Sequence, residues 1–178
     1  DNADTYELNL KGNGYELDGE EKEFESTKKT ILIRPEEEEA AYASKQSNVV
    51  NIIEKIINDF PNSKKLVLTR YKNQSDSFKK KFPENVQIIS KVVDGKKLLL
   101  SSDVFVGSGG TMTAESALLG VPTISYNAVP NRIEDYLVTK KIILRCMTPN
   151  NITKNIKKIF SLSKKSELKR KEKTKKFV

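Results

Sequence analysis

From residue 30 onward the chain alternates short apolar runs with stretches of helical length, and this alternation restricts its fold more than any other feature. Strands are expected at 30–33, 65–69, 86–89, 103–106, 123–125 and 142–144. Helices are expected at about 49–60, 95–100, 113–119 and 133–140, and a polar loop at 73–75. Strands separated by helices form βαβ crossovers, so the sequence predicts an α/β, Rossmann-like doubly wound parallel sheet of about six strands.

The segments on either side of this alternating region differ from it in composition. Residues 1–27 carry several glycines and lack clear periodicity, which predicts a linker or docking segment. Residues 28–147 form the expected Rossmann-like domain, and basic amphipathic helices are expected over 148–178. The first residue, Asp1, is interpreted as a cut end, so we expect a fragment of a longer protein.

The count of residue types excludes several kinds of chemistry. The chain contains no histidine, which excludes a Ser-His-Asp triad, a Cys-His pair and a histidine-ligated metal, and no metal site is expected. A single cysteine, Cys146, excludes an internal disulfide and favours the cytoplasm. No apolar stretch reaches the ~18 residues that span a bilayer, and no signal peptide pattern opens the chain.

The net charge of +8 is unevenly distributed, with an acidic stretch over 1–39 and a basic one over 154–176. The basic residues are mostly lysine and are not interleaved with aromatic residues, which favours a solvated surface and argues against a nucleic acid partner. Peripheral contact of the basic helices with an anionic membrane is the open alternative, as is docking onto another domain.

The run from 103 to 122 carries the most chemical information. An apolar strand ends in a turn that contains Ser108, Gly109 and Gly110, and a helix follows. The amides at a helix N-terminus attract anions, and the hydroxyls of Ser108 and Thr111 add donors, so a diphosphate is the expected guest. Neither a P-loop nor a G-x-G-x-x-G pattern is present. The alternative is that the glycines only permit tight packing of strand and helix.

Glu115 lies one helical turn after Thr111 and therefore projects toward the same end of the sheet. A carboxylate beside a diphosphate is repelled unless it serves another purpose, such as accepting hydrogen bonds from ribose hydroxyls. Stabilisation of the first helical turn is the alternative. Arg34 and Arg70 follow the first and second strands, where each is expected to contact phosphate or to remain a solvated surface residue.

The glycine turn and the residues after it resemble the donor-site signature of GT-B glycosyltransferases. The matching positions are Gly109, Glu115, Gly120 and Pro122, and the similarity is to the lipid-intermediate N-acetylglucosaminyltransferase of peptidoglycan synthesis. Non-hydrolysing UDP-N-acetylglucosamine 2-epimerases share the Ser-Gly-Gly turn. The resemblance implies that the loop binds the nucleotide diphosphate and that the glutamate binds ribose.

The same resemblance implies roles for three further residues. Val93 is expected near the base through backbone contacts, and Asn131 and Arg132 near the donor sugar. The implied substrate is a nucleotide-diphosphate sugar of the UDP type, without a cofactor. The epimerases use a histidine near the first strand of their C-terminal half, and its absence argues against epimerase chemistry by that route.

A closer resemblance is to an uncharacterised, largely archaeal family of GT-B-like proteins, over about 28–145. It rests on the segments 33–36, 41–42, 93–95 and 109–112, in order. It implies that this chain is the C-terminal half, with a Rossmann-like N-terminal domain as its partner. The expected function is donor binding in a GT-B-like glycosyltransferase-type enzyme, inactive alone. A non-catalytic sugar-nucleotide-binding or scaffold module, and an epimerase-like enzyme without the usual histidine, remain as alternatives.

Overall fold

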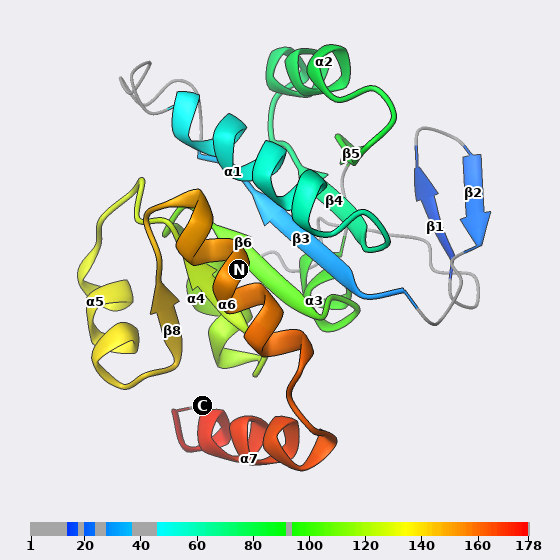
Figure 1. Cartoon of the computed structure of the whole chain (residues 1–178). Coiled ribbons are helices and arrows are strands. Elements are labelled where there is room, and N and C mark those ends of the chain that lie inside the picture. The colour runs from blue at the N-terminus through cyan, green and yellow to red at the C-terminus, as the bar shows by residue number, and fades with distance from the viewer. Residues whose placement is uncertain (1–13, 18–19, 24–27, 37–45, 92–93, 178) are drawn as a thin grey trace.

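A six-stranded parallel sheet forms the centre of the computed structural model, which describes residues 14–17, 20–23, 28–36, 46–91 and 94–177 (Figure 1). Its strands are β3 (Thr30–Arg34), β4 (Lys64–Leu68), β5 (Gln87–Ile89), β6 (Val104–Gly107), β7 (Thr123–Ser125) and β8 (Ile143–Arg145). They lie in the order β5-β4-β3-β6-β7-β8, and all neighbours are parallel. The predicted doubly wound α/β fold is confirmed.

The strand order reverses between β3 and β6. The chain leaves β3 outward through β4 and β5, returns to β6 on the other side of β3, and continues outward through β7 and β8. The register pairs Arg34 with Gly107, so the carboxyl ends of the two central strands lie side by side. Ligands of open α/β sheets bind outside the carboxyl ends of the strands at such a reversal, which makes this edge the place to look for a site.

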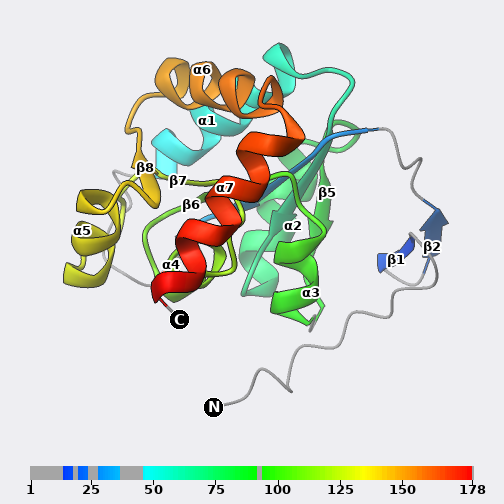
Figure 2. The same ribbon diagram turned by 90° about the horizontal axis from the view of Figure 1, so that it is seen from below.

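Helices cover both faces of the sheet, and strand alternation decides which residues meet them. They are α1 (Gln46–Asp59), α2 (Lys72–Lys81), α3 (Gly95–Leu100), α4 (Thr111–Leu118), α5 (Arg132–Thr139) and α6 (Pro149–Phe160). Ile31 and Ile33 pack in a core with residues of α1, α2 and α6, whereas Leu32 packs in a second core with residues of α3. Figure 2 shows α1 and α6 on one side of the sheet and α3 and α4 on the other.

The expected polar loop at 73–75 was wrong, because these residues lie in α2. The helix lacks a continuous apolar stripe and is held by a few specific contacts. Phe78 is buried against the core, and the amide group of Gln74 donates to the carbonyl of Glu36 at 2.8 Å and accepts from the amide of Arg70 at 3.3 Å. Such long-range contacts stabilise a helix that a periodicity pattern does not predict.

The segments outside the sheet form a hairpin and two C-terminal helices. β1 (Gly14–Leu17) and β2 (Glu20–Glu23) pair in a separate antiparallel sheet, and the role of residues 1–27 stays a prediction. α6 contributes Ile152 and Ile156 to the core, and its Phe160 ring contacts Phe60 edge-on at 5.6 Å. The boundary expected at residue 147, between the Rossmann-like domain and the C-terminal helices, also stays a prediction.

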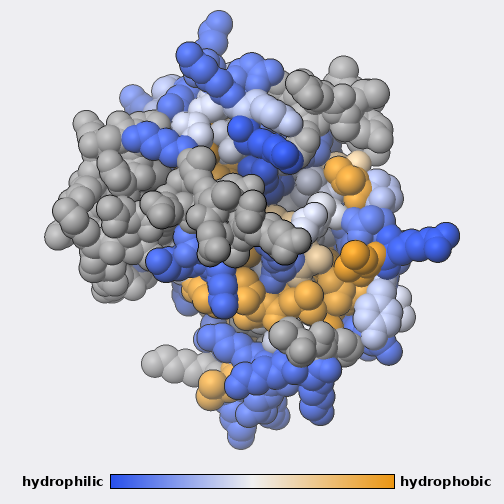
Figure 3. Space-filling model, turned by 180° about the vertical axis from the view of Figure 1, so that it is seen from behind, coloured by the Kyte–Doolittle hydropathy of each residue, from blue (hydrophilic) through white to orange (hydrophobic). Residues whose placement is uncertain are grey.

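The last helix, α7 (Lys164–Thr174), packs at the amino end of the strands. A Cβ on Gly120, which precedes β7, would lie 3.1 Å from the hydroxyl oxygen of Thr174 and 3.2 Å from Cγ of Lys171. A short 3-10 turn, Lys175–Phe177, follows. Seen from behind in Figure 3, the hydrophilic α7 lies below an apolar band on the surface. None of the helices in the described ranges has both the length and the hydropathy that a bilayer span needs.

Candidate functional site

The loop between β6 and α4 lies at the carboxyl end of the central strand pair. Ser108 is buried, Gly109 has a φ of +105°, and Gly110 caps α4 in an extended conformation. A Cβ at Gly109 would collide with Oε2 of Glu134 and would lie 2.8 Å from the carbonyl oxygen of Val129. A Cβ at Gly110 would meet no atom within 4 Å. Gly109 is therefore required by the backbone, whereas Gly110 faces open space.

The first amides of α4 are available to a ligand. The amide of Gly109 donates to the hydroxyl of Thr113 at 3.2 Å, and the carbonyl of Gly110 accepts from the amide of Thr113 at 3.0 Å. Among the described residues, no acceptor reaches the amides of Gly110, Thr111 or Met112. Unpaired amides at a helix N-terminus favour an anion there, and the diphosphate expected from the sequence stays a prediction.

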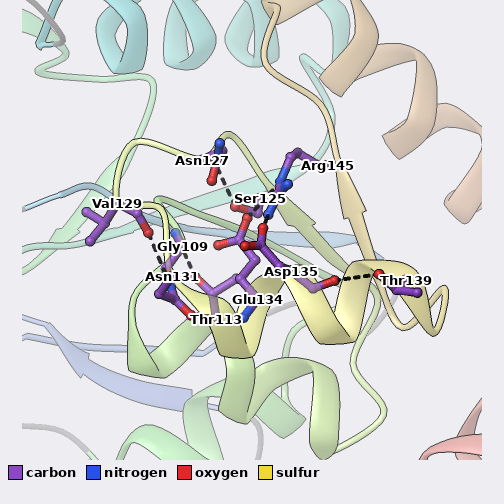
Figure 4. Close-up of polar contacts among 10 residues, drawn as sticks. All are labelled: Gly109, Thr113, Ser125, Asn127, Val129, Asn131, Glu134, Asp135, Thr139 and Arg145. Atoms are coloured by element: carbon purple, nitrogen blue, oxygen red, sulfur yellow. Dashed lines mark hydrogen bonds and ion pairs between the residues drawn. The ribbon is translucent and has the colours of Figure 1, made fainter.

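A second loop, after β7, holds the glycine loop in place (Figure 4). The amide of Val129 donates to the carbonyl of Ser108 at 2.8 Å. The side-chain amide of Asn131 donates to the carbonyls of Gly109 and Val129, and its oxygen accepts from the amide of Glu134 at 2.8 Å, which caps α5. Asn131 was expected near the donor sugar, and its side chain here supports the loop that precedes α4.

An ion pair between the buried Glu134 and the partly exposed Arg145 lies beneath the glycine loop. Glu134 is 1% exposed, and its Oε1 accepts from Nε of Arg145 at 3.2 Å. Nη2 of Arg145 lies 2.7 Å from Oδ1 of Asp135, and this hydrogen bond raises the pKa of Arg145. Within the described part of the chain, Oε2 of Glu134 has no donor and lies beside Gly109 (Figure 4). Glu134 was not among the residues expected from the sequence, where its only signal is its place in the first turn of a helix.

Across the strand reversal, Glu36 and Tyr126 form a buried pair. Tyr126 donates from its hydroxyl to Oε2 of Glu36, and burial together with the nearby carboxylate raises the pKa of this phenol well above its ordinary value. The nearby side chain of Ser108 acts in the opposite direction and lowers this pKa. Glu36 is 6% exposed, and its Oε1 has no donor among the residues that the structure describes. Neither residue was a candidate in the sequence analysis, because nothing in the sequence brings them together.

The remaining candidates lie around this edge. Arg34 donates from Nη1 to the carbonyl of Leu68 at 3.0 Å, which ties it to the end of β4. Arg70 is exposed, with its guanidinium 5.7 Å from the ring of Tyr71. Thr111, Glu115 and Arg132 are exposed, and Val93 lies outside the described residues. The described ranges contain no group of carboxylate and cysteine side chains that could hold a metal ion.

A model of a protein family described as "Protein of unknown function (DUF354)" matches residues 7–177. Among curated proteins, the uncharacterized protein MJ0665 of Methanocaldococcus jannaschii is 45% identical over 49 residues, which cover 27% of this chain and 14% of that protein. The family match agrees with the resemblance expected from the sequence.

Solved structures of two enzyme classes share the fold. UDP-GlcNAc 2-epimerase from Neisseria meningitidis, bound to UDP-GlcNAc, matches with a TM-score of 0.60, 15% identity, and coverage of 84% of this chain and 39% of that one. The UDP-GlcNAc 2-epimerase from Methanocaldococcus jannaschii matches with a TM-score of 0.62 and 15% identity. The match covers 76% of this chain and 40% of that one. The spinosyn rhamnosyltransferase SpnG, complexed with spinosyn aglycone, matches with a TM-score of 0.62 and 11% identity. The match covers 84% of this chain and 42% of that one.

These similarities show a Rossmann-like domain of the kind found in GT-B glycosyltransferases and in the epimerases. The sequence identities are too low to carry more than the fold. The chain spans about two fifths of the length of these solved structures.

Proposed function

This chain belongs to the DUF354 family of proteins of unknown function, and we propose that it is the donor-binding half of a GT-B-like glycosyltransferase-type enzyme. The ligand is a nucleotide-diphosphate sugar at the carboxyl edge of the sheet. The observation that carries the proposal is the set of unpaired amides at Gly110, Thr111 and Met112, which face the end of the sheet where strand order reverses.

The proposed site assigns each part of the ligand to a part of this edge. The diphosphate is bound by the α4 amides and by the hydroxyl of Thr111, and Arg34 or Arg70 adds positive charge from the ends of β3 and β4. Glu115, exposed one turn further along α4, accepts hydrogen bonds from the ribose hydroxyls. The role of Val93 at the base stays as the sequence resemblance implies it, and the sugar extends toward the loop before α5 with Arg132.

Catalysis in this proposal requires a second domain. The amides of α4 stabilise the negative charge that develops on the leaving diphosphate, without a metal ion. The other Rossmann-like half supplies the acceptor site and the catalytic base, so we expect the present chain to bind the donor without turnover. The proposal places the full protein in the cytoplasm.

Calorimetric titration at low salt tests the proposal, with UDP, UDP-GlcNAc, GDP and ADP as ligands. We expect saturable binding of one nucleotide diphosphate. The Glu115→Ala variant should lose at least tenfold in affinity, because a charged hydrogen-bond acceptor contributes about 1.5–3 kcal/mol. Glu172→Ala removes an exposed carboxylate from α7, at the opposite end of the strands, and serves as the matched control.

Two outcomes of this titration count against the proposal in different ways. Equal affinities of the Glu115→Ala and Glu172→Ala variants would remove the ribose role from Glu115. No binding of any nucleotide by the unmodified chain would contradict the donor site as a whole.

The fold similarity to UDP-GlcNAc 2-epimerases supports a second candidate function, a nucleotide-sugar epimerase. The chain contains no histidine, so its chemistry would depend on carboxylates or on the second domain. Incubation of the full-length protein with UDP-GlcNAc separates the candidates. A new sugar epimer in the NMR spectrum favours the epimerase, release of UDP upon addition of an acceptor favours transfer, and binding without either favours a non-catalytic module.

A further inference from the structure

The residues around the strand reversal differ in the hydrogen bonds that they offer. After β6, the amides of Gly110, Thr111 and Met112 are donors. After β3, the carboxylate of Glu36 is an acceptor, and Tyr126, whose hydroxyl binds it, packs in the core that contains residues of α1 and α6. A ligand that spans the reversal therefore needs an anionic part at α4 and a hydrogen-bond donor at Glu36.

Glu36 is held in place by contacts at both its side chain and its backbone. Oε2 accepts the hydroxyl of Tyr126, and the carbonyl oxygen of Glu36 accepts the side-chain amide of Gln74 at 2.8 Å. The phenol stays protonated because its pKa is raised, so it remains a donor to the carboxylate. Glu36 follows β3 and Ser108 follows β6 at the point where Arg34 and Gly107 pair, which places both residues at the reversal.

Oε1 of Glu36 is the atom that this arrangement leaves unused. It is buried and has no donor among the described residues. A buried carboxylate oxygen without a donor is destabilising, so native structures pair such atoms. A phosphate group cannot be its partner, since the two negative charges repel each other. Among the groups of a nucleotide-diphosphate sugar, the partner that fits is an uncharged donor, as a sugar hydroxyl or an acylamino N–H is.

We propose that Oε1 of Glu36 accepts a hydrogen bond from the sugar of a bound nucleotide-diphosphate sugar. The site then prefers the sugar nucleotide over the free nucleoside diphosphate. This inference rests on the proposed function, and Tyr126 and Gln74 act in it as positioning residues for Glu36.

The ratio of two affinities tests this inference. Dissociation constants for UDP and for UDP-GlcNAc are measured with the unmodified chain and with Glu36→Gln, which keeps the size of the side chain and removes its charge. We expect binding of UDP-GlcNAc to weaken about 10- to 100-fold and that of UDP by less than twofold, because only the sugar contacts Glu36. Glu115→Gln is the matched comparison. It should weaken the binding of UDP and of UDP-GlcNAc by the same factor, because both ligands contain the ribose that Glu115 contacts.

A second variant distinguishes the loss of the contact with the sugar from misfolding of the protein. Tyr126→Phe keeps the carboxylate and removes the donor that orients it, so we expect a smaller but selective loss of UDP-GlcNAc affinity. Retained UDP binding reports that each variant is folded.

Two results would overturn the inference, and they differ in whether the proposed function also fails. If the unmodified chain binds UDP-GlcNAc and neither Glu36→Gln nor Tyr126→Phe changes the affinity ratio, the inference fails and the proposed function stands. If the unmodified chain binds neither ligand, the proposed function fails and the inference fails with it.

Discussion

Replacement of Gly109 by alanine should destabilise the fold strongly, because two independent penalties apply at this position. The φ of +105° lies in a region that residues with a Cβ rarely adopt, which costs about 1–3 kcal/mol. The new methyl group would also collide with Oε2 of Glu134 and approach the carbonyl oxygen of Val129 to 2.8 Å. Relief of that collision requires Glu134 to move away from Arg145.

The size of the effect follows from these two terms. Loss of the hydrogen bond between Glu134 and Arg145 costs about 1–3 kcal/mol, since a buried charged group loses its partner. Together with the backbone term, the free energy of unfolding should fall by about 2–6 kcal/mol, a large share of the ~5–15 kcal/mol that stabilises a typical domain. Urea unfolding followed by circular dichroism measures this difference.

Gly110→Ala is the matched control, because residue 110 has a φ of −77° and open space around its Cβ. Its stability should change by less than about 0.5 kcal/mol or rise slightly, since alanine restricts the unfolded chain. The double variant Gly109→Ala/Glu134→Ala should lose less stability than the sum of the losses of the two single variants, because each single variant already breaks the hydrogen bond between Glu134 and Arg145. Equal urea midpoints for Gly109→Ala and Gly110→Ala would refute the reasoning.

Two further predictions concern stability. Tyr126→Phe removes the donor to Oε2 of the buried Glu36 and should lower the free energy of unfolding by about 1–3 kcal/mol; an unchanged urea midpoint would contradict the hydrogen bond. Desolvation lowers the pKa of Lys64 to about 6 from its ordinary 10.5, and it lowers that of Lys65 as well. Between about pH 6 and 10.5 the unfolded chain thus binds more protons than the native one, and stability should rise with pH across this window. Lys64→Met should flatten that rise between pH 7 and 9, and an identical slope would count against a neutral Lys64.

The order of helices and strands was predictable from the sequence because the central strands are almost continuously apolar. Ile31, Leu32 and Ile33 are all buried, since both faces of a parallel sheet are covered, and such runs stand out against polar helices. α2 was missed for the opposite reason. This helix depends on Gln74 and Phe78, whose partners lie elsewhere in the sequence. The local periodicity of residues 72–81 does not indicate those contacts.

Only the part of the candidate site that consecutive residues form could be predicted from the sequence. The turn at Ser108, Gly109 and Gly110 could be identified because strand, turn and helix follow one another directly along the chain. Glu134 beneath the turn depends on a contact from a helix that begins more than twenty residues later, and its sequence context suggested only a helix start. Glu36 and Tyr126 meet only because β7 is placed beside β6 and β6 beside β3.

The bond between Tyr126 and Glu36 joins residues that are 90 positions apart. Contacts over such a separation form slowly during folding, because most of the intervening chain must be ordered first. A chain whose β7 has not yet docked therefore lacks this pair, even when the strands from β3 to β5 have assembled. A ligand held on both sides of the reversal would bind only the completed sheet and would protect it from unfolding and proteolysis by mass action.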